Sequence, residues 1–323
     1  MSNPLPAVVD NIVISVMPNA VRGELVNCCS SHLDIYINGS FIVQIPVVQG
    51  KLSDKQSFMF KTHPTFLDAL PHEYTVKFLE SDTGRLLGES SDIGESEGNG
   101  DLFSKLEDGY MVSAKGGYLF KPPSLDRRWK SDILTAYNLA RQALNEACVD
   151  EKYDLFLAYG SLLGAIRSGE FIAHDDDFDA GFFIKVDSIE EAASKFHEIY
   201  RSLEKLGYKV WFKNHVGNLN IKFKDLPPVE IWMFYYLRGT KELCGYNIAV
   251  ECDGEQAVEP LKKIEFVDNF VMVPNSPELL LEATYGAGWR VPDPSFQWRT
   301  TELVKRYMKK YELASKKHAL DTS

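Results

Sequence analysis

The sequence has few cysteines and no long hydrophobic run. Its five cysteines, at positions 28, 29, 148, 244 and 252, are an odd number without metal-type pairing, so neither a disulfide framework nor a zinc site is indicated. No apolar run reaches the roughly 18 residues of a membrane span, and residues 1–30 lack the basic and apolar stretches of a secretory leader. We therefore expect a cytoplasmic protein that does not cross a membrane.

Basic residues are in the minority. The 35 Lys and Arg residues face 46 Asp and Glu residues, which gives a net charge of −11. Nucleic-acid binding needs clustered Lys and Arg to neutralise phosphates, so the balance argues against a nucleic-acid partner. At 323 residues, 45% of them hydrophobic, the chain is long enough for two cores of ordinary domain size.

The acidic residues concentrate in one segment, GSLLGAIRSGEFIAHDDDFDAG at 160–181. Four of its carboxylates fall within five positions: Asp175, Asp176, Asp177 and Asp179. Acids this close repel one another unless a cation compensates them, and a hard divalent ion such as Mg²⁺ or Mn²⁺ suits them. An isolated acidic run is more often a solvated turn, but strand-like residues follow this one. Because strand positions two apart share a face, Asp177 and Asp179 should point the same way.

A strand, a turn and a helix precede these acids. Residues 155–159 form a short apolar run, Gly160 and Ser161 make a turn, and residues 162–167 continue as a helix. Backbone N–H groups at such a helix start can bind phosphate oxygens, and Arg167 would add a positive charge. A Gly-Ser pair is a weak signal by itself. Followed by Asp-x-Asp on a second strand, it predicts a nucleotidyltransferase-type fold.

This stretch resembles the core motif of the LicD family and of fukutin and fukutin-related protein, in which G-T/S-L-L-G-A-x-R precedes F-I-P-W-D-D-D-x-D. The chain departs from that motif at Ala173-His174, which replaces Pro-Trp. The segment VEIWMFYYL at 229–237 resembles the strand that supplies a third metal-site carboxylate, although Glu230 stands where Asp is commoner. The segment LLLEATYGAGWRVP at 279–292 resembles the C-terminal Y-G-x-x-W-x-x-P element.

The resemblance implies transfer of a phospho-alcohol, such as phosphocholine, glycerol phosphate or ribitol phosphate, from a CDP-linked donor to a glycan. The acceptor would be a hydroxyl of a surface polysaccharide, such as capsule or lipopolysaccharide, or of its precursor. Mg²⁺ or Mn²⁺ would be held by Asp177, Asp179 and Glu230, while Asp175 or Asp176 would accept the proton of the attacking hydroxyl. The residues expected to bind the substrates or their phosphates are Gly160, Ser161, Arg167, Tyr285, Trp289 and Arg290. For Trp289 a place in the core remains the alternative.

Two other functions remain open. The same fold transfers a nucleotidyl group from an NTP, which would release pyrophosphate instead of CMP. A non-catalytic glycan-binding protein is the third interpretation, but a decayed site would have lost acids, and all of them are present.

The rest of the chain completes an α+β prediction. Residues 1–120 carry short β-branched and aromatic runs between turns, typical of an antiparallel β-sandwich, which we interpret as an accessory domain with possible glycan binding. The pair Pro122-Pro123 marks the junction, and residues 121–323 form the catalytic domain, a mixed sheet with helices, including helices at 129–149 and 189–206. The final helix is rich in lysine, so peripheral contact with an anionic membrane is an alternative to a solvated terminus.

Overall fold

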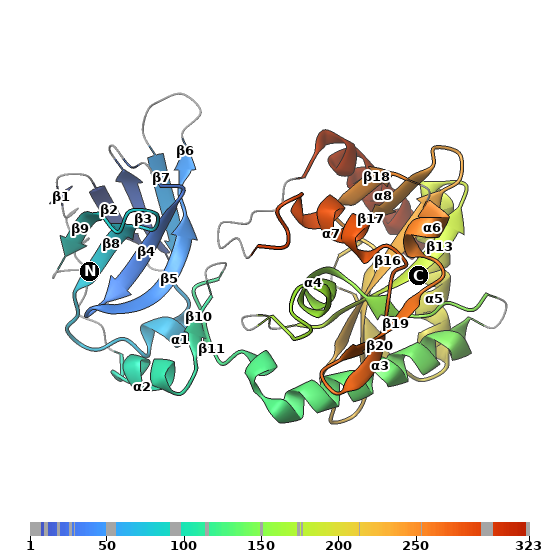
Figure 1. Ribbon diagram of the computed structural model, residues 1–323, viewed down its shortest axis with the longest axis horizontal. Coiled ribbons are helices and arrows are strands. Elements are labelled where there is room, and N and C mark those ends of the chain that lie inside the picture. Colours follow the sequence, from blue (N-terminus) through green and yellow to red (C-terminus); the bar gives the residue numbers. More distant parts are fainter. Residues whose placement is uncertain are drawn as a thin grey trace. The chain divides into compact units, whose positions relative to one another are not determined.

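The chain divides into two compact units, Met1–Pro122 and Pro123–Ser323. The structure is a computed structural model (Figure 1). It describes residues 8–9, 12–17, 20–25, 28, 30–49, 56–90, 98–113, 116–148, 151–172, 175, 177–212, 214–252, 254–291 and 300–320. Over these ranges, no helix is both long and apolar enough to cross a membrane.

The first unit contains two antiparallel sheets. One sheet has the order β1-β2-β3-β7-β6, with β1 at Val8–Val9, β2 at Ile12–Met17, β3 at Ala20–Leu25, β7 at Gln56–Lys61 and β6 at Val48–Gln49. The other has the order β5-β4-β8-β9, with β5 at Ser40–Pro46, β4 at His32–Ile37, β8 at Val76–Glu80 and β9 at Leu86–Ser90. A hairpin of β10 (Met111–Val112) and β11 (Leu119–Phe120) and the helices α1 (Pro64–Leu67) and α2 (Leu102–Glu107) accompany them.

The two sheets of this unit share one core. The rings of Phe58 on β7 and Phe78 on β8 have centroids 5.3 Å apart, so side chains of the two sheets meet. Along β4, Leu33, Ile35 and Ile37 are buried and alternate with polar residues that face outward. The predicted antiparallel sandwich ahead of a mixed α+β fold is confirmed.

The second unit contains a seven-stranded mixed sheet. Its main path is β12-β13-β16-β15-β14, and β17 pairs with both β16 and β18. These strands are β12 (Phe156–Leu157), β13 (Asp179–Val186), β14 (Lys209–Trp211), β15 (Asn218–Lys222), β16 (Val229–Leu237), β17 (Glu242–Gly245) and β18 (Ile248–Glu251). A separate hairpin pairs β19 (Lys262–Phe266) with β20 (Asn269–Val273). Within the sheet, β13 and β16 run parallel, and the other pairings are antiparallel.

Helices cover this sheet. They are the 3₁₀ turn η1 (Pro123–Leu125) and the α-helices α3 (Arg127–Ala147), α4 (Tyr159–Arg167), α5 (Ile189–Lys205), α6 (Gly254–Val258), α7 (Pro277–Tyr285) and α8 (Glu302–Leu320). The helices predicted at 129–149 and 189–206 are present as α3 and α5. Each begins after a residue whose side chain accepts a first-turn N–H, Asp126 for α3 and Ser188 for α5.

The lysine-rich C-terminal helix α8 packs against the rest of its unit. Its buried side chains include Val304, Tyr307 and Tyr311, and the Tyr311 ring stacks on Tyr235 of β16 with centroids 5.9 Å apart. The apolar side of α8 is therefore used inside the protein. Any contact of α8 with an anionic membrane would depend on its exposed lysines.

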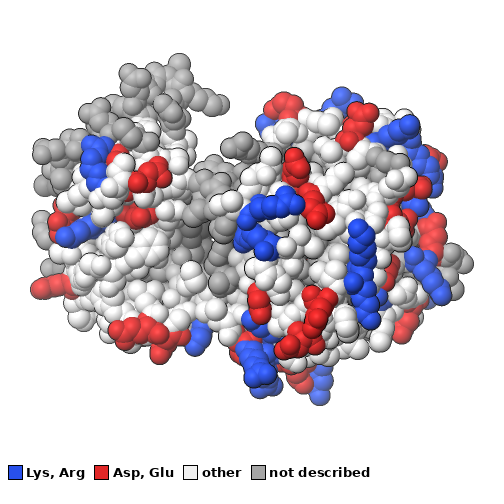
Figure 2. All heavy atoms as spheres, viewed as in Figure 1, with Lys and Arg blue, Asp and Glu red and all other residues white. Residues whose placement is uncertain are grey.

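Charges of both signs are interspersed on the second unit. On the face shown in Figure 2, Lys and Arg side chains alternate with Asp and Glu, and the described residues form no broad basic surface there.

Candidate metal centre

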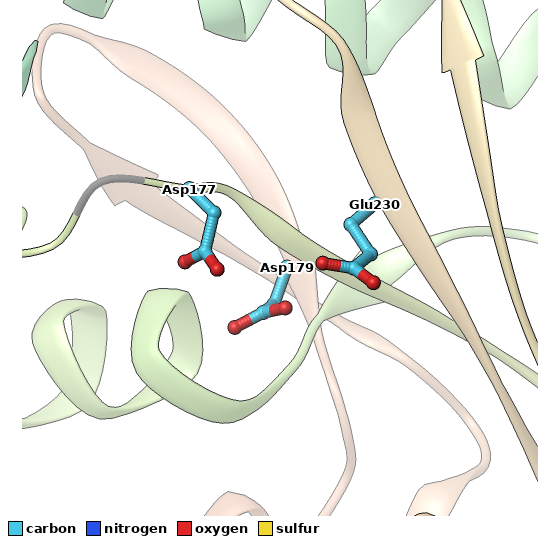
Figure 3. Close-up of side chains that lie close together, drawn as sticks. All are labelled: Asp177, Asp179 and Glu230. Carbon is cyan, nitrogen blue, oxygen red and sulfur yellow. The ribbon is translucent and has the colours of Figure 1, made fainter. Parts of the chain in front are cut away.

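Three carboxylates converge at the start of two neighbouring strands. In the parallel pairing of β13 with β16, Asp179 lies opposite Glu230, and the Glu230 N–H donates to the carbonyl of Phe178 at 3.1 Å. Asp177 lies two residues before Asp179, just outside the strand. Each of Asp177, Asp179 and Glu230 offers an oxygen, and these three oxygens lie within 4.8 Å of one another. Figure 3 shows the three carboxylates pointing toward one another.

Of the two other aspartates of the run, the structure describes Asp175 but not Asp176. Asp175 lies against Gly160, where a Cβ would overlap its carboxylate, so any larger residue at position 160 would displace the Asp175 side chain. Asp175 therefore reaches the N-terminal turn of α4, where the positive end of the helix dipole favours an anion.

Ser161 ties α4 to the first residue of β13. Its hydroxyl is buried and accepts a hydrogen bond from the Asp179 N–H at 2.9 Å, while the Ala158 N–H donates to the Asp179 carbonyl at 3.1 Å. Tyr159, between them, has a φ of 40°, in the left-handed region that a bulky residue rarely adopts. Such strain is common at functional sites. Ser161 thus holds the backbone of a candidate metal ligand, and its contact with phosphate stays a prediction.

The neighbouring carboxylates make ionisation of Asp179 less favourable. Asp179 is only 7% exposed. Burial, followed by the charges of Asp177 and Asp175, raises its pKa well above the ordinary value, whereas a hydrogen bond from Trp232 acts in the opposite direction. A cation at this position would remove the repulsion.

The side chains present fit a hard divalent cation. All three converging ligands are carboxylates, which Mg²⁺ and Mn²⁺ prefer over nitrogen or sulfur donors. The neighbouring Asn218 adds an unusual atom, because its buried Oδ1 has no hydrogen-bond partner among the described residues. Buried polar atoms are normally paired, so this oxygen is consistent with a site that receives a hydrated ion or ligand.

Arg167 and Tyr285 lie near the acidic cluster. Arg167 ends α4, and Tyr285 ends α7. Burial raises the pKa of Tyr285, the charges of Asp179, Asp175 and Asp177 raise it further, and Arg167 lowers it. The phenol and the guanidinium are thus within the electrostatic influence of the site. Their binding to substrate remains a prediction.

Trp289 is buried in the hydrophobic core, and the neighbouring Arg290 is exposed. Trp289 is 5% exposed and belongs to the hydrophobic core of the second unit, while the guanidinium of the exposed Arg290 covers its ring at 4.3 Å. A ring this enclosed has no free face for a base or sugar. Its burial favours the alternative of a core residue, and its contact with substrate remains untested.

Replacing Trp289 with Ala is therefore expected to lower stability by about 3–5 kcal/mol through loss of packing, with the KM values of the remaining folded protein unchanged. Thermal unfolding and steady-state kinetics measure the two effects. Arg290→Ala is the matched comparison, because it leaves the core filled and should leave the Tm nearly unchanged. A raised KM without a lowered Tm in Trp289→Ala would show that the ring binds substrate.

Two side-chain contacts at the centre were not predicted from the sequence. The Trp232 indole N–H donates to Asp179 Oδ1 at 2.8 Å, and the Asn218 amide N–H donates to Glu230 Oε1. Trp232 lies two residues after Glu230 on the same strand, so the strand period places it on the same face and was the available signal. Asn218 comes from β15, and no local pattern links it to Glu230.

A strand, a strained helix start and two paired strands with converging carboxylates form the arrangement that the sequence predicts for a nucleotidyltransferase-type fold. Residues 152–276 match the family model described as LicD/FKTN/FKRP, nucleotidyltransferase domain. The segment is thus a nucleotidyltransferase domain of the LicD family, which confirms the resemblance seen in the sequence and suggests a phosphotransferase or nucleotidyltransferase activity. It includes Asp177, Asp179 and Glu230 and ends before Tyr285.

The comparisons with curated proteins and with solved structures do not identify a function. The search of curated proteins found no match. Among solved structures, lincosamide antibiotic adenylyltransferase LnuA bound to lincomycin matches 57% of this chain and 95% of its own, with 14% identity and a TM-score of 0.29. A likeness at this TM-score supports no conclusion about fold or function.

Proposed function

We propose that the chain is a metal-dependent transferase that moves a phospho-alcohol from a CDP-linked donor to a hydroxyl of a surface polysaccharide or its precursor. The observation that carries the proposal is the convergence of Asp177, Asp179 and Glu230 within a LicD-family domain. The alcohol belongs to the phosphocholine, glycerol phosphate or ribitol phosphate type.

In this proposal the three carboxylates hold the cation and Asp175 acts as the base. Bound Mg²⁺ or Mn²⁺ would supply positive charge for the donor diphosphate and for the departing CMP. The acceptor oxygen forms a bond to the phosphorus that carries the alcohol, the bond from this phosphorus to the CMP oxygen breaks, and Asp175 takes the hydroxyl proton. Arg167 and Tyr285 bind the donor, and the backbone at Gly160 and Ser161 faces its phosphates.

Orientation and electrostatics supply most of the catalysis in this scheme, since no covalent enzyme intermediate is needed. The start of α4 and β13 are joined by the Ser161 and Ala158 hydrogen bonds, which fix the backbone of Asp179 relative to the helix start. This rigidity would hold the reacting oxygens in line.

We also propose that the first unit binds the glycan acceptor. The outward face of β4 and β5 carries Phe41, which is 51% exposed and meets Tyr36 edge-on with centroids 5.6 Å apart. Beside them, Asp34 accepts hydrogen bonds from Gln44 at 2.9 Å and Ser81 at 2.5 Å. Aromatic rings suit the apolar faces of sugars, and oriented polar groups suit their hydroxyls. The exposed lysines of α8 would allow peripheral contact with an anionic membrane at the site of glycan synthesis.

A donor screen tests the proposed reaction. The full chain with Mg²⁺ or Mn²⁺ is incubated with CDP-choline, CDP-glycerol or CDP-ribitol and a glycan acceptor, and CMP release is measured. We expect CMP from one of these donors, and none when EDTA removes the metal. Pyrophosphate from an NTP would identify a nucleotidyltransferase instead. Glycan binding without turnover of any donor would indicate the non-catalytic alternative.

A further inference from the structure

We infer that Asn218 and Trp232 are positioning residues that each hold one metal-binding carboxylate in place through a single N–H donor. The inference rests on the proposed metal site and goes beyond it, because it assigns residues that contact the ligands instead of the cation. Asn218 acts on Glu230, and Trp232 acts on Asp179.

The sheet register makes this arrangement possible. Asn218 of β15 lies opposite Trp232 of β16, and Glu230 of β16 lies opposite Asp179 of β13. Trp232 and Glu230 are two residues apart on one strand, so their side chains share a face. Two donors and two acceptors thus gather on three adjacent strands, and each donor reaches a different carboxylate.

The chemistry of Asn218 fixes its orientation. An ionised carboxylate only accepts hydrogen bonds, so the amide must present its NH₂ group to Glu230 and turn its Oδ1 elsewhere. Asn218 is 7% exposed, and that Oδ1 has no partner among the described residues. A buried amide oxygen without a donor is costly. The water molecules of a hydrated cation are donors, so a cation bound at the site would supply the missing hydrogen bond to Asn218 Oδ1.

Packing fixes the orientation of Trp232. Its indole stacks on Tyr246 with centroids 4.9 Å apart, and the Tyr159 ring lies edge-on to it at 5.2 Å. The Tyr159 hydroxyl in turn donates to the Tyr246 carbonyl at 2.7 Å. These contacts hold the indole N–H in the direction of Asp179 Oδ1.

Loss of either donor should weaken metal binding without removing a ligand. Hydrogen-bond partners of metal ligands typically contribute about 10–100-fold to metal affinity, because they orient the ligand and keep it ionised. We therefore expect the Mn²⁺ Kd to rise at least about 10-fold in Asn218→Ala and in Trp232→Phe.

The test is Mn²⁺ titration of the full-length chain by calorimetry, with circular dichroism to verify folding. Asn269→Ala is the control for the Asn-to-Ala change, because Asn269 is exposed at the start of β20, outside the mixed sheet that carries the three carboxylates. Trp211→Phe on β14 is the control for Trp232. Both controls should keep the wild-type Kd. Mn²⁺ should also quench tryptophan fluorescence in the wild type and in Trp211→Phe, but much less in Trp232→Phe.

The outcomes separate this inference from the proposed function. If the wild-type chain binds no Mn²⁺, the metal site itself is wrong. If the wild type binds Mn²⁺, Asp179→Asn does not, and both Asn218→Ala and Trp232→Phe keep the wild-type Kd, the metal site stands and the positioning roles are overturned. Should Asn218→Ala fail to fold, Asn218→Leu, which keeps the volume of the side chain without an N–H donor, is titrated in its place. Trp232→Phe keeps an aromatic ring in the stack and tests the indole N–H through its Kd and its quenching.

Discussion

Asp179→Asn is expected to reduce kcat by roughly 10³-fold or more while leaving the fold intact, since a lost metal interaction of several kcal/mol corresponds to about one decade per 1.4 kcal/mol. The substitution keeps the size of the side chain and still offers Oδ1 to the Trp232 indole, so it removes mainly the charge. CMP release under saturating donor measures the effect. Asp187→Asn is the control, because Asp187 follows the other end of β13 and is exposed beside Arg238.

The same variant should be at least as stable as the wild type when metal is absent. The pKa of Asp179 is raised by burial and by Asp177 and Asp175, so its ionised form destabilises the folded state above the carboxyl pKa of the unfolded chain, and protonation relieves that cost as the pH falls. Asn removes the cost at neutral pH. Adding Mn²⁺ should raise the Tm of the wild type only. Turnover near the wild-type level, or an equal Tm rise in the variant, would contradict the metal-site model.

Local sequence patterns could predict the parts of the centre that lie close together in the chain. Asp177 and Asp179 share a face because a strand repeats every two residues, and the apolar run and the residues after it predict a strand followed by a helix. The predicted turn at Gly160 and Ser161 is wrong, because α4 begins at Tyr159 and both residues lie in its first turn. Glu230 needed the family resemblance, because only the parallel register of β13 with β16 brings it opposite Asp179.

Contacts between distant segments could not be predicted. Nothing near Gly160 in the sequence indicates that Asp175 approaches it, and Asn218 meets Glu230 through the pairing of β15 with β16. The Y-G-x-x-W element likewise does not tell whether the Trp289 ring faces the core or a ligand. The lysines of α8 predict a basic helix. Only the packing shows that the apolar side of this helix faces its own unit, where Tyr311 stacks on Tyr235.

The second large effect is expected when the first of the two units is removed. All candidate ligands lie after residue 159, and the second unit begins at Pro123 with a hydrophobic core of its own. A truncated chain that starts at Pro123 is therefore expected to bind Mn²⁺ with the wild-type Kd and to release CMP from the donor with a short oligosaccharide acceptor.

On a polymeric acceptor, the same truncated chain should lose activity by about 10²-fold or more, because only a long glycan can occupy the first unit and the catalytic centre together and gain from effective concentration. The ratio of kcat/KM for polymer to kcat/KM for oligosaccharide measures this loss.

In the full-length chain, Phe41→Ala should reproduce much of the loss on polymer alone, since it removes the exposed ring of the proposed glycan surface and leaves the rest of the sandwich intact. Glu107→Ala, at the end of α2 in the same unit, is the control and should change neither rate. Equal losses on both acceptors, in the truncated chain and in Phe41→Ala, would mean that the first unit supports the structure and does not bind glycan. If the truncated chain is insoluble, Phe41→Ala makes the same comparison within the intact protein, because its effect depends on the ring and not on the fold of the isolated second unit.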